Sequence, residues 1–483
     1  MSEHCGYIIE IKNLRPHNNA DRLQILEIFG TETCVGLEVK KGDIGVYFPT
    51  DLQLSEEFCI ANDLVERKDE NGEKAGGYLH PTKRNIKCIK LRGEKSDGMY
   101  LSIKCFDYLN LKEPLKVGDK VSIIEGHEIC RKYIPVNKNK TSNVSKVKTG
   151  RRKAPIAPLF AEHVDTEQLP YNLDAFKPGD LVEITLKMHG TSQRTAYLPV
   201  FKGYKETWLD KVNNWLGKFF NKAGEDENTY NGTPIYEWDY VTGTRRTVIE
   251  DFEKKSYYDS NDFRREHAQK LEGRLYKGET VYYEVVGFQT NGVPIMASCE
   301  NSKTADKEFI KKYGKTTVFS YGCSDGVGMV EDENHNGVLV KAKPESEMYV
   351  YRMTMTNEDG NVVEYTPDFM RYRCEQMGIK TVPVLWKGII PDFYQLPDDV
   401  GSLQEINAGE FIKNIAEQYY DGPDPIGKNH VREGVVVRIL NKPSFKAYKW
   451  KNFHFKCLEG IAKAEATAPD MEEAQDELAG EMN

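Results

Sequence analysis

One lysine stands where a predicted strand ends at a glycine turn. Residues 182–189 alternate apolar and polar side chains, the period of a strand with one buried and one open face. Lys187 falls on the open face, and Gly190 can turn the chain into a returning strand at residues 193–198. A lysine amine held in a cleft can act as a nucleophile, although most lysines on exposed strands are only solvated. Lys187 is therefore a candidate whose role depends on the rest of the chain.

Charged side chains interrupt three later segments that are otherwise apolar or alternating. Glu284 lies within the apolar run at residues 281–288, and Glu433 stands at the start of another apolar run. A buried carboxylate must be paired, hydrated or open to a cleft. Lys449 and Lys451 are two positions apart, so a strand would aim both from one face. Two such lysines can hold a phosphate, and two carboxylates can hold a hydrated divalent metal. A structural salt bridge would explain any one of these features by itself.

The first part of the chain is predicted to form a small β-barrel. Its β-rich segments are bounded by turn-forming residues and lie at 7–11, 23–29, 44–49, 86–91 and 120–124. Three phrases resemble OB-fold domains related to tRNA-binding modules: Asn19-Ala20-Asp21-Arg22-Leu23, Val39-Lys40-Lys41-Gly42-Asp43 and Leu91-Arg92-Gly93-Glu94-Lys95-Ser96-Asp97-Gly98. The resemblance favours the OB-fold over other small barrels. Four basic residues and one tyrosine could line a groove that follows a phosphate backbone, or they could simply make the surface soluble. They are Lys87, Lys90, Arg92, Lys95 and Tyr100.

The rest of the chain is predicted to alternate strands with helices, which makes the whole protein α+β. Helical patterns run through residues 206–223, 262–275, 367–377 and 403–420. Residues 131–153 contain nine lysines and arginines and no acidic residue, which predicts a linker, either alone or with phosphate contacts. We therefore divide the chain into an OB-like domain (1–130), a basic linker (131–158), a second domain (159–464) and an acidic tail (465–483).

Composition narrows the class of protein. The chain has 483 residues and a net charge of -9, so any nucleic-acid contact must come from a local patch. Its ten cysteines are scattered without a CxxC pair, which argues against a zinc site and a disulfide framework. The first residues lack the basic and then apolar pattern of a signal sequence, and no run of 18 apolar residues occurs. We expect a cytoplasmic protein with reduced thiols and no membrane partner.

Six motifs, taken in order over residues 159–456, resemble the covalent nucleotidyltransferases, which include DNA ligases, RNA ligases and mRNA capping enzymes. They are Lys187-Met188-His189-Gly190-Thr191-Ser192, Gly243-Thr244-Arg245-Arg246, Tyr283-Glu284-Val285-Val286-Gly287, Tyr349-Val350-Tyr351-Arg352, Glu433-Gly434-Val435-Val436 and Lys449-Trp450-Lys451. His189 stands where DNA ligases and capping enzymes usually have Asp. Together with an OB-like domain placed before the catalytic domain, this looks like one branch of ATP-dependent RNA ligases.

The resemblance implies a fold and a role for each motif. The second domain is expected to consist of antiparallel sheets with flanking helices, and Lys187 to accept AMP from ATP. Lys449 and Lys451 would contact the α-phosphate, and we expect burial and these two cations to favour the neutral amine of Lys187. Glu284 and Glu433 would hold the waters of Mg2+ or Mn2+.

The remaining motif residues would bind the nucleotide. Arg245 or Arg246 would contact the ribose or a phosphate, and we favour Arg245. Tyr351 would stack on adenine, with Tyr321 as its rival. His189 would contact the metal waters or cap the turn.

The function that follows is an ATP-dependent RNA ligase, expected to act as a monomer. It would transfer AMP to an RNA 5'-phosphate and seal that end to a 3'-hydroxyl. Two alternatives stay open: a DNA ligase or GTP-dependent capping enzyme, and a catalytically degenerate RNA-binding protein.

Overall fold

The computed structural model describes residues 4–459 except 51, 69–73, 78, 92–93, 134–153, 165, 206, 210–211, 213–232, 254–257, 259–260, 305, 333–334, 396–402, 406 and 443. Most of the predicted basic linker and of the helix over residues 206–223 lies outside the described residues, as do Arg92 and the acidic tail.

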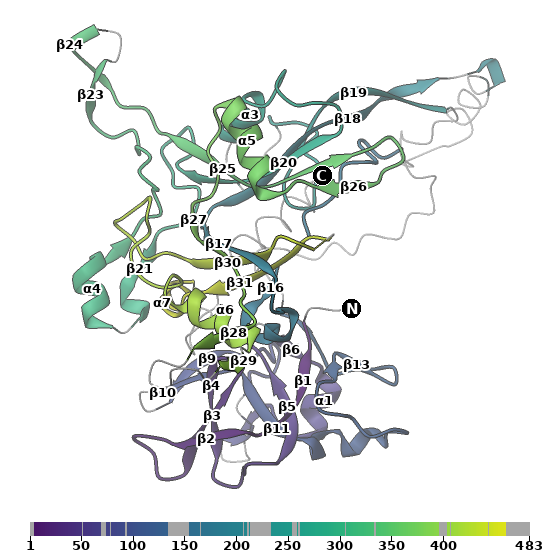
Figure 1. The fold of residues 1–483 in the computed structure, drawn as a ribbon, viewed down its shortest axis with the longest axis vertical. Helices are drawn as coiled ribbons and strands as arrows, with labels where there is room; N and C mark the ends of the chain where they lie inside the picture. The colour runs from purple at the N-terminus through teal and green to yellow at the C-terminus, as the bar shows by residue number, and fades with distance from the viewer. Residues whose placement is uncertain are drawn as a thin grey trace.

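The N-terminal region is built from short strands, as the sequence predicts (Figure 1). Its described strands form a four-stranded sheet in the order β11-β5-β1-β12, a three-stranded sheet β2-β3-β4 and several two-stranded ribbons, and they do not close into one barrel. The OB-like barrel therefore stays a prediction. The elements are β1 (Gly6–Glu10), β2 (Asn13–Pro16), β3 (Leu23–Ile28), β4 (Thr31–Gly36), β5 (Ile44–Phe48), β6 (Leu52–Leu54), α1 (Glu56–Ala61), β7 (Glu66–Lys68), β8 (Lys74–Gly76), β9 (Cys88–Leu91), β10 (Glu94–Asp97), β11 (Met99–Ser102), η1 (Ile103–Leu109), β12 (Lys120–Val121), β13 (Ile123–Ile124), β14 (His127–Glu128) and β15 (Cys130–Lys132).

Two five-stranded sheets dominate the rest of the chain. The first sheet has the order β16-β31-β30-β17-β27, with a parallel pair only between β16 and β31, and the second is the antiparallel sheet β19-β18-β20-β25-β26. Their strands are β16 (Glu167–Gln168), β17 (Leu181–Lys187), β18 (Thr191–Lys205), β19 (Thr233–Gly243), β20 (Glu279–Gly287), β25 (Ser346–Thr356), β26 (Val362–Glu364), β27 (Val384–Ile389), β30 (Gly434–Ile439) and β31 (Lys446–Lys451).

Shorter elements surround the two sheets. They are η2 (Leu169–Tyr171), η3 (Leu173–Ala175), α3 (Asp262–Gln269), β21 (Cys299–Glu300), η4 (Asn301–Thr304), α4 (Lys307–Tyr313), β22 (Thr316–Thr317), β23 (Met329–Asp332), β24 (His335–Lys341), α5 (Pro367–Met377), β28 (Phe393–Gln395), β29 (Leu403–Glu405), α6 (Ala408–Glu417) and α7 (Phe453–Leu458). The predicted helix at 367–377 is confirmed as α5. The one at 403–420 is partly wrong, because β29 precedes α6 and the side chain of Asn407 caps the helix by accepting from the Glu410 N–H.

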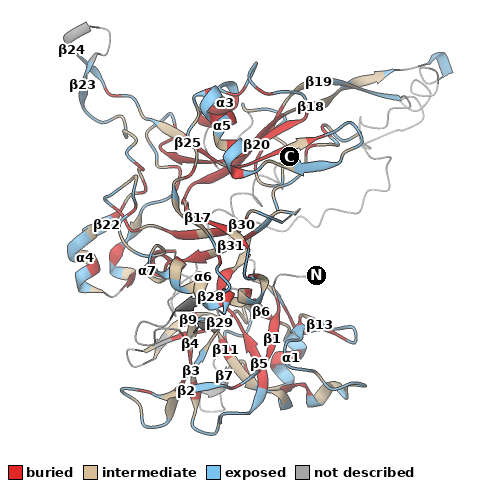
Figure 2. Cartoon of the chain, in the orientation of Figure 1, coloured by how far each residue is buried: buried red, intermediate tan, exposed pale blue. Residues whose placement is uncertain are grey.

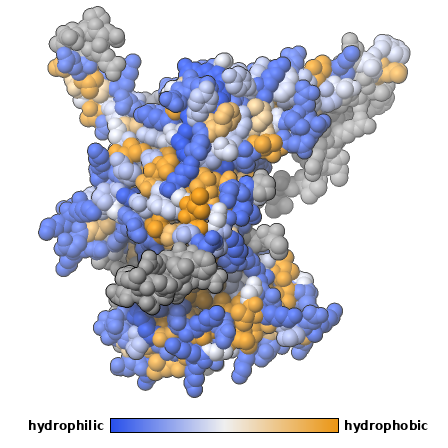
Figure 3. Space-filling model, in the orientation of Figure 1, coloured by the Kyte–Doolittle hydropathy of each residue, from blue (hydrophilic) through white to orange (hydrophobic). Residues whose placement is uncertain are grey.

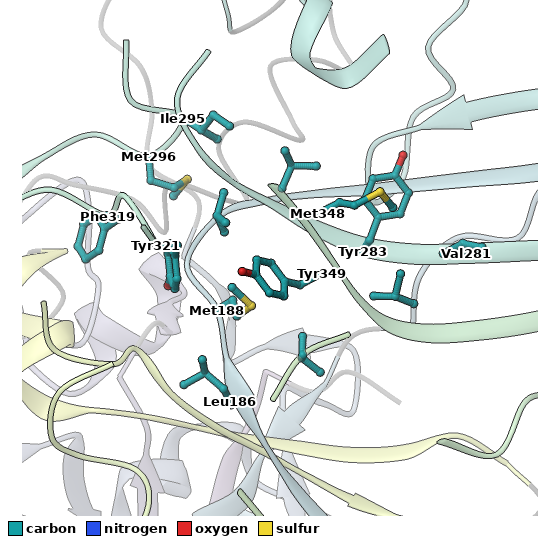
Figure 4. Close-up of a cluster of buried hydrophobic side chains, with 14 of the residues drawn as sticks. Leu186, Met188, Val281, Tyr283, Ile295, Met296, Phe319, Tyr321, Met348 and Tyr349 are labelled. Carbon is teal, nitrogen blue, oxygen red and sulfur yellow. The ribbon is translucent and has the colours of Figure 1, made fainter. Parts of the chain in front are cut away.

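The predicted hairpin after Lys187 is wrong. Strand β17 pairs with β27 and β30, whereas β18 pairs with β19 and β20, so the chain crosses from the first sheet to the second at residues 188–190. Gly190 is needed for close approach, since a Cβ there would lie 2.4 Å from the carbonyl oxygen of Val285. Figure 4 shows Leu186 and Met188 at this crossing, beside the buried rings of Tyr321 and Tyr349. Lys187 therefore ends a strand at the junction of two sheets.

The first sheet buries one face, as the alternation in its strands predicts. Val182, Ile184, Val435, Val437 and Tyr448 pack with apolar side chains of α6, such as Ile412 and Ala416, in one core. The strand centres of both sheets are buried (Figure 2). Because alternate residues of each strand point the other way, the polar residues of β17, β30 and β31 share the opposite face.

The N-terminal region lies on the α6 and α7 side of the first sheet, and the second sheet lies on the other side (Figure 1). Tyr171 of η2 packs against Tyr7, Phe29 and Tyr47, with ring centroids 5.5–6.2 Å apart. Lys456 of α7 forms a 3.1 Å ion pair with Asp97 at the end of β10. These contacts join the N-terminal region to the helices that follow the first sheet.

Three further findings concern the whole chain. All ten cysteines are free in the structure. Among the described residues, no helix has the length and apolar character needed to cross a membrane. Hydrophilic side chains cover much of the face in Figure 3, and exposed apolar residues such as Met329 and Leu339 gather on the β23–β24 hairpin that projects from the body.

Candidate functional site

A cavity lies between the open face of the first sheet and the elements of the second sheet and α5. Its floor is formed by alternate residues of β17, β30 and β31. These residues lie side by side because the strand register pairs Thr185 with Val436 and Val436 with Lys449. The floor residues are Glu183, Thr185, Lys187, Val436, Arg438, Ala447 and Lys449. The other walls include His163, Arg245, Glu284, Tyr351, Pro367, Met370, Arg371 and Phe445. The cavity thus collects residues from positions 163 to 449.

Lys187 lies at the inner end of this floor. Its side chain is 14% exposed, and its Nζ is 2.7 Å from Oε1 of Glu433, the residue before β30. Register places Lys187 opposite Gly434, where φ is +150° and a Cβ would lie 2.1 Å from the carbonyl oxygen of Trp450. Only glycine fits there without strain. In this arrangement the Glu433 carboxylate is an ion-pair partner for Lys187, and the bias toward the neutral amine expected from the sequence stays a prediction.

The structure brings four more predicted residues to the cavity with Lys187. These are Arg245, Glu284, Tyr351 and Lys449. Glu284 is buried on β20, while Arg245, Tyr351 and Lys449 are half-buried.

Two rival candidates from the sequence lie elsewhere. Arg246 is exposed and does not line the cavity, and its carbonyl oxygen accepts a hydrogen bond from Arg194. Tyr321 is buried in the core, where its hydroxyl accepts the backbone N–H of His189 at 2.7 Å. The hydroxyl of Tyr351 lies 2.9 Å from that of Ser192. The geometry therefore favours Arg245 and Tyr351 as the residues that can meet a ligand.

Glu433, Lys451 and His189 lie beside the cavity in a buried ionic cluster with Glu459. Lys451 Nζ is 3.2 Å from Glu433 Oε1 and donates to both oxygens of Glu459 at 3.0 and 2.8 Å. The His189 ring packs between Phe319 and Phe455, and its Nδ1 is 3.8 Å from Glu433 and 3.9 Å from Glu459. None of these four side chains lines the cavity. Lys187 links the cavity to this cluster through Glu433.

Electrostatics keep Glu433 ionised. Burial raises the pKa of this carboxyl, but the charges of Lys187, Lys451 and His189 outweigh burial and lower the pKa below its ordinary value. His189, Glu433 and Glu459 also offer ligand atoms within 4.8 Å of one another. Lysine ammonium groups contact the carboxylates of both Glu433 and Glu459, so in this arrangement lysines balance the negative charge of the cluster.

Two residues of the site were missed from the sequence. Glu459 directly follows α7, outside any strand pattern, and no spacing signals its return to Lys451. His163 lies in an extended segment without periodicity, and its ring contacts Tyr351 edge to face with centroids 5.1 Å apart. Arg352 can only donate, so the His163 Nδ1 at 3.3 Å accepts and the proton of the neutral ring is on Nε2.

His163 remains neutral at ordinary pH. Burial, followed by the charges of Arg245, Arg352, Arg194 and Lys449, lowers its pKa well below the usual value. It therefore adds a hydrogen-bond donor to the cavity without adding charge.

The cavity lining carries an excess of positive charge. Five lysines and arginines line it against two glutamates, and one of these, Glu183, is held by Arg371 at 3.1 and 2.8 Å. Such a cavity attracts an anionic ligand. The aromatic ring of Tyr351 on its wall adds a surface on which a planar group can stack.

Comparisons with known proteins give a match of fold. No protein-family model matches the chain, and no curated protein matches it. Among solved structures it is similar to a Naegleria gruberi RNA ligase with PPi, at 15% identity and a TM-score of 0.50, over 94% of this chain and 98% of that one. Mutants of that ligase with ATP and Mn, and with AMP and Mn, each match at 16% identity and a TM-score of 0.49, over 93% of this chain and 97% and 96% of theirs. The chain shares the fold of the PPi-bound RNA ligase along almost its whole length.

Proposed function

We propose that this protein is an ATP-dependent RNA ligase in which Lys187 becomes covalently linked to AMP. The observation that carries the proposal is the position of Lys187 on the floor of a cationic cavity that also contains Arg245, Tyr351 and Lys449. The shared fold with an RNA ligase supports the same conclusion. The domain division proposed from the sequence, with an RNA-binding OB-like domain before the nucleotidyltransferase domain, belongs to this assignment.

The cavity fits ATP by the chemistry of its lining. Tyr351 would stack on adenine, and Arg245 would contact the ribose or a phosphate. Lys449 would bind the α-phosphate, and His163 would donate its Nε2 proton to an acceptor on the nucleotide. Each of these groups belongs to the cavity wall, so their roles require no rearrangement of the sheets.

A divalent cation fits one carboxylate better than the other. Glu284 lines the cavity and can hold the waters of Mg2+ or Mn2+, as proposed from the sequence. Glu433 could join it only after giving up a lysine contact, since both Lys187 and Lys451 lie within 3.2 Å of its Oε1. The bound metal would supply charge neutralisation for the phosphates. The Naegleria gruberi ligase mutants similar to this chain contain Mn with ATP or AMP.

The reaction would proceed in three displacements. Lys187 loses a proton to water, and its Nζ forms a bond to the α-phosphorus and gives up a second proton. The bond from that phosphorus to the bridging oxygen breaks, which releases pyrophosphate. A 5'-phosphate oxygen of RNA then attacks the same phosphorus, and the N–P bond breaks as the nitrogen takes up a proton from water, which regenerates the amine. Finally the 3'-hydroxyl attacks the 5'-phosphorus and loses its proton, and AMP leaves. Cations fixed around the phosphates would stabilise each transition state.

The proposal is tested by incubating the purified protein with ATP labelled at the α-phosphate and Mg2+ or Mn2+. The expected result is an acid-labile AMP adduct on Lys187, identified by peptide mass. Absence of the adduct would contradict the enzyme assignment and leave the degenerate RNA-binding protein. An adduct formed from GTP rather than ATP would indicate a capping enzyme.

The polynucleotide substrate is tested separately. Nicked duplexes that differ only in a ribose or deoxyribose at the 3' end distinguish RNA from DNA joining, because the 2'-hydroxyl is their one difference. We expect faster sealing of the ribose end. Equal rates would contradict the RNA assignment without affecting the AMP adduct.

A further inference from the structure

Glu459 is a buried carboxylate close to the proposed nucleophile but outside its cavity. It lies one residue beyond α7, which follows β31 after Asn452, so the chain leaves the strand, makes a short helix and returns to Lys451. Its side chain is 2% exposed, and both oxygens accept hydrogen bonds from Lys451 Nζ. A carboxylate this buried is costly unless its partner is fixed.

The support of Glu459 is rigid. Phe455 and Leu458 of α7 are fully buried, and the Glu459 N–H donates to the carbonyl oxygen of Phe455 at 3.0 Å. Lys303 Nζ donates to the carbonyl oxygen of Leu458 at 3.2 Å. The helix end is thus held by core packing and by a second segment, and the Glu459 carboxylate has a defined position.

Two carboxylates, those of Glu433 and Glu459, pair with the two lysines Lys187 and Lys451. Glu433 Oε1 lies 2.7 Å from Lys187 and 3.2 Å from Lys451, so both ammonium groups compete for one oxygen. Glu459 takes two hydrogen bonds from Lys451, which leaves the shorter Glu433 contact to Lys187. Without Glu459, Lys451 would keep its contact with Glu433 at 3.2 Å and compete with Lys187 for that oxygen.

We propose that Glu459 is a positioning residue for AMP transfer: by holding Lys451, it fixes the Glu433 carboxylate and Lys187 in their relative places. This inference rests on the proposed function, because it concerns the reactivity of Lys187. Glu459 does not touch the nucleotide cavity, so its effect is on the rate of the chemical step and not on nucleotide binding.

The experiment is a double-mutant cycle on adduct formation, with α-labelled ATP in single-turnover mode. Glu459→Gln is expected to slow the step at saturating ATP by about 30-fold, with the apparent ATP affinity changed by less than about twofold. Lys451→Met is expected to slow it at least as much. Because Glu459 acts through Lys451, the double variant should be no slower than Lys451→Met alone. Glu459→Asp, which keeps the charge, should recover part of the rate.

A matched control is Glu375→Gln, which removes an exposed glutamate on α5 and should leave the rate unchanged. Circular dichroism melting checks that each variant folds. If Glu459→Gln unfolds, a double variant that carries Lys451→Met and Glu459→Met takes its place, because it removes both charges together. The rate of that double variant is compared with the rate of Lys451→Met alone. A wild-type rate in folded Glu459→Gln, or losses that add in the double variant, would overturn the inference. Absence of the adduct in the wild type would instead overturn the proposed function.

Discussion

Lys449 and Lys451 point from the same face of the same strand into different surroundings. Lys449 lines the open cavity and is half-buried. Lys451 is 8% exposed and is held by Glu433 and Glu459 in the buried ionic cluster. The sheet sets the direction of both side chains, whereas α7 decides which one is closed off from the cavity. Two positions on the same face of a strand therefore have different roles: Lys449 can contact a ligand, whereas Lys451 forms ion pairs within the protein.

Replacing Lys449 and replacing Lys451 should also differ in their cost to the stability of the fold. Lys449 faces the cavity, so its counter-charge would arrive with the ligand and its replacement should leave the buried ion pairs intact. In the cluster, loss of one partner leaves a buried charge without compensation, which typically costs about 3–5 kcal/mol. Substitutions on the two sides should therefore separate catalysis from stability.

The largest expected effect is at Lys187, which lines the cavity and links it to the cluster through Glu433. Lys187→Ala should reduce adduct formation by at least about 10,000-fold, because no other group replaces the nucleophile. Folding should persist, since Glu433 keeps Lys451 at 3.2 Å. The measurements are labelled-ATP incorporation and thermal unfolding, and joining of pre-adenylated RNA should partly survive. Adduct formation by the variant would show that another residue accepts AMP.

The two lysines of β31 test the comparison directly. Lys449→Met should slow adduct formation by about 100-fold and change the free energy of unfolding by less than about 0.5 kcal/mol. Lys451→Met should also slow the reaction and should destabilise the protein by about 3 kcal/mol, because Glu459 and Glu433 lose a buried partner. Denaturant titration of both variants measures the difference. Equal destabilisation would mean that the cavity and cluster do not differ as described.

Local sequence pattern was sufficient to assign the faces of these strands. Alternation in residues 182–187 and 447–451 predicts which side chains leave the core, and the structure confirms both assignments. Alternation does not specify which strands pair. The Thr185 hydroxyl donates to the carbonyl oxygen of Val436, 251 positions away, and no local signal contains that pairing. This is why the predicted hairpin after Lys187 was wrong although both of its strands exist.

The parts of the site that were missed share a physical reason. Glu459 reaches Lys451 only because α7 reverses the chain, and His163 reaches Tyr351 from a segment without regular hydrogen bonding. Neither position has a period that would fix its direction. Residues on alternating strands or within the family motifs could be predicted, whereas Glu459 and His163, which tertiary packing brings to the site, could not.

A smaller effect should appear in the pH dependence of stability. The folded-state pKa of His163 is lowered, so the unfolded chain takes up its proton first as the pH falls. The stability that depends on the neutral ring is complete above the ordinary histidine pKa of 6.5 and declines below it, by at most about 1.4 kcal/mol per pH unit. His163→Asn should therefore lose less stability than the wild type between pH 7 and 5.

Urea titration across this range measures the effect. The comparison with the wild type isolates His163, because His267 and His430 also have lowered pKa values and remain in both proteins. Glu433 titrates in a lower window, since its pKa is below the ordinary carboxyl value. Identical pH profiles for the two proteins would contradict a neutral His163 in the folded state.

The smallest expected effect concerns the far side of the cluster. Helix α7 touches the N-terminal region through the Lys456–Asp97 ion pair and is followed at once by Glu459, which holds Lys451. Asp97→Asn removes the charge but can keep the 3.1 Å hydrogen bond accepted from Thr50. The Lys456 and Asp97 side chains are 17% and 11% exposed, but asparagine keeps a hydrogen-bonding group in place, so the variant should lose about 1 kcal/mol of stability and slow adduct formation by about twofold to threefold through looser support of Glu459. Lys311→Met on exposed α4 is the control and should change neither quantity. If Asp97→Asn destabilises the protein without altering the rate, the cluster is fixed by its own core contacts, and the N-terminal region contributes docking alone.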